Sequence, residues 1–409
     1  MNWIEMISNF QKTSKIPLST LSEGPGIYYV VYSVASIAHV GYVQALVITA
    51  IALGSVYVVP CYWMYRRFGA IENSDFARIA MVGTVLVSMS DVMIYSTTVA
   101  RPLLIGLFLL PIAIWALQSL YENFRWITFI GLLTVSGFIL LTHAPFTYVV
   151  LMVVVSSTAL LYDRLGKWSA GYILGIYTMY GIVIEFLIPD LGRIWRIELF
   201  SAYPLGIIAT AFGNAFSLIF TLVGLSVLLI VLVRSRVHVN FTRRLGSSRF
   251  QTLTLFLLAL SFAVVVAVLG AYSAYIDYYY GSMLRFLILQ GWKGVFGIIA
   301  LMGLGIHLRR TRNSSVVVAW VISLAVLVVI LALYTPLRGF PGLFNLDERV
   351  AEFLYYPGFY FVAVGLDHIA KNSPPRVFRW VILPLISLFT IPSMMTGVRD
   401  VSLIRPINS

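Results

Sequence analysis

The chain has 409 residues, of which 60% are apolar and 11% charged, and its mean hydropathy is +0.92. This composition excludes an ordinary soluble domain. The formal net charge is +12, but the basic residues are concentrated in short connections between apolar runs, so nucleic acid is not expected as a partner. The single cysteine, Cys61, excludes an intramolecular disulfide and a cysteine-based metal site.

Residues 1–41 are predicted to form an N-terminal segment outside the membrane. The opening stretch MNWIEMISNFQKTSKIP is polar and lacks the apolar centre of a signal peptide. Gly26–Ile37 is apolar but too short to cross a bilayer. We therefore expect an interfacial helix on the outer side.

Residues 42–394 are predicted to form one transmembrane helical domain, followed by an outer tail at residues 395–409. The apolar runs are about 16–23 residues long, which is enough to cross the hydrocarbon core as helices, and helices close their backbone hydrogen bonds within each span. The predicted fold class is all-α, a polytopic membrane helical bundle with about twelve spans. The spans are Tyr42–Trp63, Ala77–Val92, Leu103–Leu120, Trp126–Leu141, Pro145–Tyr162, Trp168–Ile188, Ala211–Val233, Leu253–Ala271, Phe286–Leu308, Val316–Leu333, Phe353–Ile369 and Trp380–Ser393.

The connections between these spans alternate in charge. One set, which includes MYRRFG, ENFRW, LRRTR and KNSPPRVFR, holds 17 Lys and Arg residues with their span ends and only 5 acids. The other set holds 10 basic and 11 acidic residues. The positive-inside rule makes the basic set cytoplasmic. We expect a multi-pass protein of the plasma membrane, in contact with the lipid bilayer, with both termini outside.

The segment IYSTTVARP places charge between two apolar runs. Asp91 is predicted to end the second span, and Arg101 and Pro102 to open the third. Proline suits the first helical position, where its missing N–H costs nothing. Arg101 is then expected at the outer surface near Asp91. An ion pair with Asp91, snorkelling to water and a binding role all stay open.

Three further outer stretches combine acids, arginines and aromatic residues: Glu185–Pro204, Ala271–Arg285 and Leu337–Pro357. Arginine binds phosphate through its planar fork, and a carboxylate serves as a general base or metal ligand. An ordinary aromatic belt is the alternative. The predicted catalytic carboxylates are Asp91, Asp277 and Asp347, and the predicted phosphate- or substrate-binding residues are Arg101, Arg193, Arg196, Arg285, Arg349, Tyr95 and Tyr278.

Two other residue types bear on function. Lys293 lies within a predicted span, where a lysine is a functional candidate, although pairing with a carbonyl or snorkelling explains it equally well. The five histidines show no metal-ligand spacing, so no metal-binding residue is predicted.

Several stretches resemble a known family. KIPLSTLSEGPGIYYVVYSVASI, YWMYRRFGA and YSTTVARP follow one another near the N-terminus, and LLTHAPFTYVVLMVVV and LDERVAEFLYYPGFYFVAVGL come later. Together they are similar to the C-type (GT-C) integral membrane glycosyltransferases, especially archaeal ones. The resemblance is strongest over Ile16–Leu165.

The resemblance implies transfer of a sugar from a polyprenyl-phosphate carrier, the donor substrate, to an acceptor on the outer face. It places Asp91 and Arg101 beside the site, and Arg285 and Arg349 at the carrier phosphate. It also implies that the chain starts within the family's first outer loop, without the first transmembrane helix and its catalytic aspartate. Glu5 and Glu23 are the acids left there and are secondary catalytic candidates. A divalent metal is left open.

Two alternatives to a catalytic glycosyltransferase remain from the sequence. The chain is a non-catalytic subunit of a membrane glycosylation complex that pairs with another membrane protein, or it is a transporter or flippase of a lipid-linked or small polar substrate. Lys293 is the candidate for the second alternative.

Overall fold

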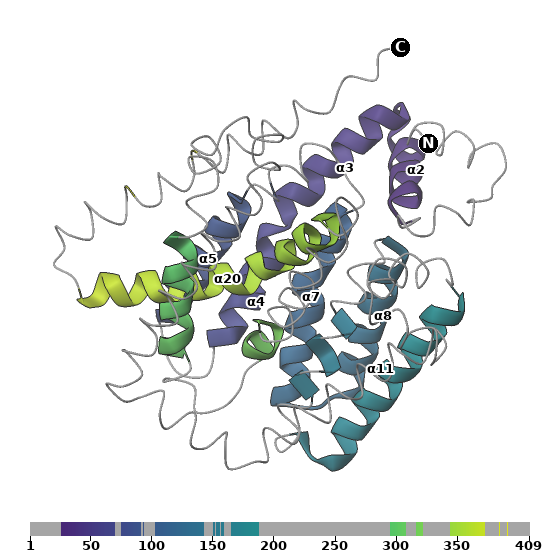
Figure 1. Ribbon diagram of the computed structural model, residues 1–409. Coiled ribbons are helices and arrows are strands. Elements are labelled where there is room, and N and C mark those ends of the chain that lie inside the picture. The colour runs from purple at the N-terminus through teal and green to yellow at the C-terminus, as the bar shows by residue number, and fades with distance from the viewer. Residues whose placement is uncertain are drawn as a thin grey trace. The chain divides into compact units, whose positions relative to one another are not determined.

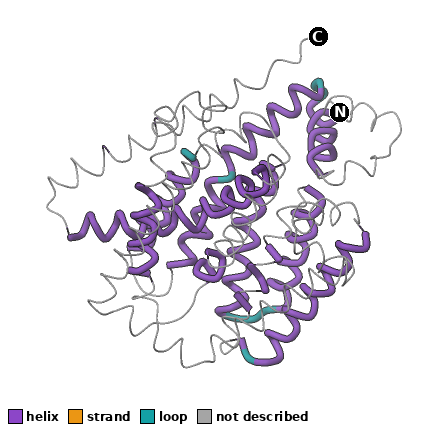
Figure 2. The backbone as a smooth tube through the Cα atoms, viewed as in Figure 1, coloured by secondary structure: helices purple, strands orange, loops and turns teal. Residues whose placement is uncertain are grey.

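The computed structural model describes residues 26–69, 75–90, 93, 103–142, 150–151, 153–155, 157–158, 165–187, 295–307, 316–321, 344–372, 384 and 391. In these residues the regular structure is helical, and Figure 2 draws helices and loops but no strand. The all-α prediction is therefore confirmed for the described part of the chain. The helices labelled in Figure 1 are α2 (Gly26–Ala38), α3 (Tyr42–Val56), α4 (Val58–Gly69), α5 (Asp75–Ser88), α7 (Leu103–Glu122), α8 (Trp126–Thr142), α11 (Lys167–Leu187) and α20 (Phe344–Asn372).

Among the described residues, two helices are long and apolar enough to cross a membrane: Tyr42–Phe68, which combines α3 and α4, and Ile105–Glu122 in α7. Shorter apolar helices include Trp126–Leu140 and Val295–His307. A membrane-associated helical protein follows from these findings. The number of twelve spans stays a prediction, and the predicted spans Ala211–Val233 and Leu253–Ala271 lie outside the described residues.

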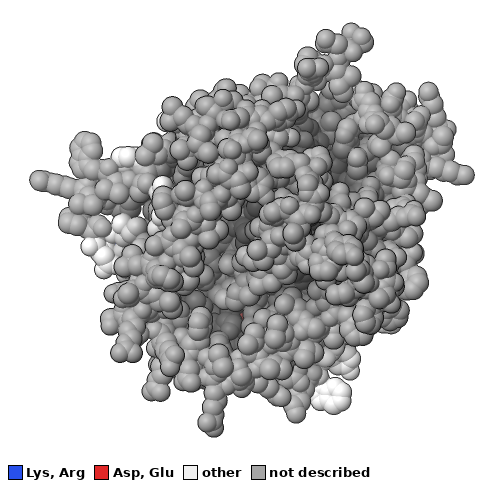
Figure 3. Space-filling view, in the orientation of Figure 1, with Lys and Arg blue, Asp and Glu red and all other residues white. Residues whose placement is uncertain are grey.

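Much of the apolar surface of α3 is exposed. The continuous helix Tyr42–Phe68, formed by α3 and α4, has a mean hydropathy of 2.0 over its most apolar 18 residues, yet only 28% of these residues are buried. Val43, Val47, Ile48 and Ile51 are all exposed on α3. Figure 3 shows a different part of the molecule, where the described atoms at the left and lower right edges are neither Lys or Arg nor Asp or Glu. An apolar surface of this kind is favourable against lipid chains and costly in water.

The predicted spans agree well with the helices in the first half of the chain. The start of α7 at Leu103 and that of α8 at Trp126 match the prediction. The helix predicted at Gly26–Ile37 is also present, as α2, while its position in an interface stays a prediction. In contrast, α20 begins at Phe344 rather than Phe353. The charged residues there lowered the hydropathy, but Leu, Glu, Arg and Ala are good helix formers.

The chain divides into two compact units. Unit 1 contains Met1–Ala80, Ser96–Val231 and Ser314–Pro357, and unit 2 contains Met81–Tyr95, Leu232–Asn313 and Gly358–Ser409. Within unit 1, α7 packs against α8, α4 and α3, and α2 packs against α3. An apolar core between these helices includes Val31, Ala35, Ala45 and Ile105.

Hydroxyl groups link helical segments of unit 1. The Tyr121 hydroxyl on α7 lies 2.7 Å from the hydroxyls of Ser157 and Thr158. On α8, the Ser136 hydroxyl lies 2.9 Å from that of Tyr177 on α11. These bonds satisfy polar groups that lie away from water, which would otherwise destabilise the fold.

In unit 2, helix Val295–His307 crosses the second half of α20 at two glycines. A methyl group at Gly303 would overlap the carbonyl oxygen of Phe361, and one at Gly365 would lie 2.6 Å from the carbonyl oxygen of Ile299. Beside this crossing the buried His307 ring lies edge-on to Tyr360, with Nδ1 3.3 Å from the Tyr360 hydroxyl. Glycine lets the two backbones approach this closely, as small residues do at helix interfaces in membranes.

The crossing predicts a position-specific effect of alanine. Gly303→Ala is expected to lower the free energy of unfolding by about 1–3 kcal/mol, because the methyl group forces the helices apart. Gly305→Ala, two residues along the same helix, meets no atom within 4 Å and should leave stability unchanged or raise it slightly. Thermal unfolding of both variants in detergent measures the difference. Equal midpoints would contradict the close crossing.

Candidate functional site

Unit 1 contains a buried group of aromatic side chains at which three proline-containing helices meet. We call Tyr57, Tyr65, Trp320 and Tyr356 the tyrosine junction. All four side chains are almost completely buried. Trp320 stacks on Tyr356 with ring centroids 6.0 Å apart, and Tyr57 contacts Tyr356 edge-on at 6.5 Å. Such ring pairs add to the stabilisation that burial of the apolar surface provides.

The first hydrogen bond of the junction replaces a helical backbone hydrogen bond that a proline removes. Pro111 lies inside α7 and has no N–H, so the carbonyl of Leu107, four residues earlier, loses its partner in the helix. The Tyr356 hydroxyl donates a hydrogen bond to this Leu107 carbonyl oxygen at 2.8 Å. A side chain of α20 thus completes the hydrogen bonding of α7 at its interruption.

The second polar bond joins α4 to α20 beside another proline. The Tyr65 hydroxyl donates to the carbonyl oxygen of Tyr356 at 2.7 Å, and the next residue, Pro357, lies inside α20. Tyr356 therefore accepts a bond from α4 through its backbone and donates one to α7 through its side chain. Three helices are held together by one residue.

The third interruption lies between α3 and α4, at Tyr57. Pro60 in the first turn of α4 cannot donate to the Val56 carbonyl, which ends the regular pattern of α3. The backbone nevertheless stays helical at Tyr57, since its φ and ψ are −54° and −30° and its N–H donates to the Leu53 carbonyl at 2.9 Å. From this helical position the Tyr57 ring contacts Tyr356 edge-on.

Two buried donors of the junction have no hydrogen-bond partner among the described residues: the Tyr57 hydroxyl and the Trp320 indole N–H. The buried thiol of Cys61, four residues after Tyr57, is a poor hydrogen-bonding group. An unpaired buried donor costs about 1–3 kcal/mol.

A second polar group joins the ends of α4 and α7. Arg67 Nη2 makes an ion pair with Glu122 Oε2, and Gln118 Nε2 donates to Glu122 Oε1 at 3.2 Å. The sequence placed Arg67 and Glu122 on the same side of the membrane but did not pair them. Their contact shows that these two helix ends lie together within unit 1.

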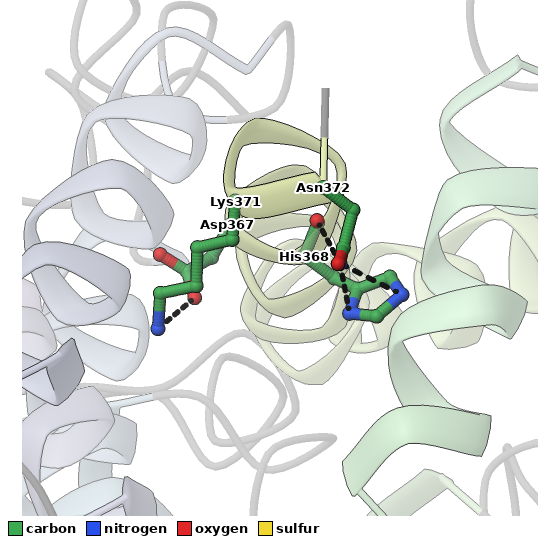
Figure 4. Close-up of polar contacts among 4 residues, drawn as sticks. All are labelled: Asp367, His368, Lys371 and Asn372. Atoms are coloured by element: carbon green, nitrogen blue, oxygen red, sulfur yellow. Dashed lines mark hydrogen bonds and ion pairs between the residues drawn. The ribbon is translucent and has the colours of Figure 1, made fainter. Parts of the chain in front are cut away.

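The last turns of α20, in unit 2, form a third polar group (Figure 4). Lys371 Nζ lies 3.2 Å from Asp367 Oδ2, and Asn372 Nδ2 donates to the backbone carbonyl of His368 at 2.8 Å. Both contacts join residues four apart on one helix, and a lysine in the last turn favours the negative end of the helix dipole. The described residues hold no group of three His, Cys, Asp or Glu that could bind a metal ion.

The structure leaves the predicted site residues untested. Asp347 and Arg349 lie on α20, and only their backbone is described. Helix α5 ends at Ser88, before the predicted outer turn, and helix α7 begins at Leu103, after it. The remaining candidates lie outside the described residues: Glu5, Glu23, Asp91, Tyr95, Arg101, Arg193, Arg196, Asp277, Tyr278 and Arg285, together with Lys293.

The sequence analysis missed the tyrosine junction. Three prolines lie within runs that were predicted as spans or at their ends, namely Pro60, Pro111 and Pro357. Each proline signals a carbonyl that needs a donor from elsewhere. An aromatic belt was the alternative for the stretch that contains Tyr356, and no role was predicted for Tyr57 or Tyr65. All three side chains are buried.

Comparison with known proteins yields a distant structural similarity. The chain is similar to a crystal structure of the Archaeoglobus fulgidus oligosaccharyltransferase in complex with Zn and sulfate, with a TM-score of 0.46 and 14% sequence identity. The match covers 91% of this chain and 44% of that protein, so the chain spans less than half of its length. No protein-family model and no curated protein matches the chain. At this TM-score and identity the similarity does not establish a shared fold or activity.

The Leu107–Tyr356 bond predicts a coupling between two substitutions. Tyr356→Phe should cost about 1–3 kcal/mol of unfolding free energy, because it leaves the Leu107 carbonyl without a donor. In a Pro111→Ala background the backbone N–H gained at position 111 supplies that donor, and the cost of Tyr356→Phe should fall. A double-mutant cycle on thermal unfolding in detergent measures the coupling.

A matched control is available on α11. The Tyr180 hydroxyl donates to the Ser136 carbonyl at 2.7 Å, a bond of the same type with no proline four residues beyond the acceptor. Tyr180→Phe and Pro111→Ala should therefore be additive. A Tyr356→Phe cost that is unchanged by Pro111→Ala would show that proline has no part in the contact.

Proposed function

We propose that the chain is a glycosyltransferase-like protein of the plasma membrane that transfers a sugar from a polyprenyl-phosphate carrier on the outer face. The observation that carries this proposal is the position of Asp91 and Arg101. Both lie in the connection between two apolar helices, α5 and α7. The resemblance to GT-C glycosyltransferases noted in the sequence includes this stretch, YSTTVARP.

The chemistry assigned to the two residues follows from their side chains. The acceptor hydroxyl attacks the anomeric carbon while the bond from that carbon to the carrier phosphate breaks, and the carrier phosphate leaves with the electron pair. Asp91 accepts the proton of the acceptor hydroxyl as a general base. Arg101 binds the phosphate oxygens through its guanidinium fork, which stabilises the charge of the leaving group. Arg285 and Arg349 are further candidates for the carrier phosphate, and Asp277 and Asp347 for the carboxylate.

Transfer of labelled sugar from a polyprenyl-phosphate donor to endogenous acceptors in membranes tests the assignment. Asp91→Asn and Arg101→Ala should each abolish transfer and leave the folded yield unchanged. Asp163→Asn and Arg236→Ala, which remove the same charges from predicted cytoplasmic connections, should retain activity. Normal transfer in both Asp91→Asn and Arg101→Ala would refute the assignment.

The orientation belongs to the same proposal: basic connections cytoplasmic and both termini outside. A membrane-impermeant maleimide on intact cells tests it, because the one native thiol, Cys61, is fully buried and should stay unlabelled. His39→Cys is expected to react from outside. Asn123→Cys should react only after the membrane is permeabilised. Labelling of Asn123→Cys in intact cells would reverse the orientation.

A transporter or flippase is the second candidate, and the tyrosine junction favours it. Transporters build their substrate sites from helices that are interrupted within the membrane, and α7 and α20 are proline-containing helices joined at Tyr356. Accumulation of substrate in proteoliposomes that is lost in Lys293→Ala would support this candidate. Stable co-purification with a second membrane protein, without transfer activity, would support a non-catalytic subunit.

A further inference from the structure

One end of unit 1 gathers the ends of four helices. The ion pair of Arg67 with Glu122 joins the last turns of α4 and α7. A short turn then leads into α8, whose first residue, Trp126, contacts Tyr172 on α11 with ring centroids 5.6 Å apart. The ends of α4 and α7 and the starts of α8 and α11 therefore form one rim.

Tryptophan side chains project from this rim. Trp63 is 50% exposed, Trp126 54% and Trp168 82%. Each lies within three residues of a basic residue in the sequence. Tryptophan concentrates at the level of lipid headgroups, where its ring contacts acyl chains and its N–H contacts polar groups.

The rim also carries cationic groups that are available to a ligand. Arg66 and Arg125 are exposed, and neither makes an ion pair with a carboxylate of the described residues. The Arg66 guanidinium lies 5.5 Å from the centre of the Trp63 ring, which holds it in place by a cation–π interaction. Glu122 does not neutralise them, since its oxygens already bind Arg67 and Gln118.

Apolar side chains continue from the rim along the helices. Val59 on α4 and Ile127 and Ile130 on α8 are exposed. A ligand that fits this surface has a negatively charged phosphate at the level of the arginines and hydrocarbon at the level of the aliphatic side chains.

We propose that this rim, with Arg66 and Arg125 as its cationic groups, binds the phosphodiester headgroups of anionic phospholipids. Guanidinium groups donate two hydrogen bonds to a phosphate, and the exposed tryptophans fix the depth at which headgroup and acyl chain separate. The binding does not depend on sugar transfer, so it stands whether or not the proposed activity is correct.

Lipid retention tests the rim directly. The full chain is reconstituted in nanodiscs of equal parts phosphatidylcholine and phosphatidylglycerol and extracted into mild detergent, and the lipids still bound are counted by native mass spectrometry. Wild type should retain more phosphatidylglycerol than phosphatidylcholine. The ratio should fall roughly fivefold for each arginine removed in R66Q/R125Q, whereas R66K/R125K should keep most of the preference.

A salt titration on the wild type keeps the test decisive if a variant folds poorly. The preference should decline as ionic strength rises, because exposed charges are screened over about 3 Å at 1 M salt and about 10 Å at 0.1 M. Equal retention of both lipids by wild type would overturn the proposal, as would an R66Q/R125Q preference equal to that of wild type.

Discussion

The tyrosine junction depends on the cost of a backbone carbonyl without a donor in apolar surroundings. Proline removes an N–H from a helix, and away from water nothing replaces it unless the protein supplies another donor. In unit 1 that donor is the Tyr356 hydroxyl, which binds the Leu107 carbonyl across to α7. This one requirement fixes the rotation of α20 about its axis at Tyr356, because the hydroxyl must reach a carbonyl on a neighbouring helix. The Tyr65 bond and the stacked Trp320 then pack around that position.

The same requirement explains where polar residues occur elsewhere in unit 1. Buried hydroxyls bind one another between helices, as Tyr121 does with Ser157 and Thr158. Charged groups instead lie at helix ends, as Arg67 and Glu122 do. Neutral donors are suited to the interior because they bring a hydrogen bond without the desolvation cost of a charge. Among the described residues of unit 1, hydrogen bonds between hydroxyl groups therefore connect the helices in the interior, and an ion pair connects the helix ends at the rim.

Hydropathy predicted much of the fold but not the contacts that organise it. The bounds of α7, α8 and α11 follow from runs of apolar residues flanked by charge, because the need to bury a helix in lipid is local to that helix. The start of α20 was wrong by nine residues, since charged helix formers continue a helix where hydropathy falls. The Leu107–Tyr356 bond joins residues 249 apart in sequence, and one sequence contains no signal for such a distant pair. For the candidate site, the structure places Asp347 and Arg349 on α20, where the sequence predicted an outer loop.

The length of α20 has a consequence for the bilayer around it. Its 29 residues have a contour length of about 43 Å at 1.5 Å per residue, whereas the hydrocarbon core measures about 30 Å. A helix that spans this core must relieve the mismatch by leaning, bending or projecting. Pro357 lies near the middle of α20, where proline favours a kink, and Asp347 and Arg349 lie in its first two turns. A helix of this length that crossed the bilayer would carry its charged first turns about 13 Å beyond the hydrocarbon core, and bilayer thickness would then set how far they project.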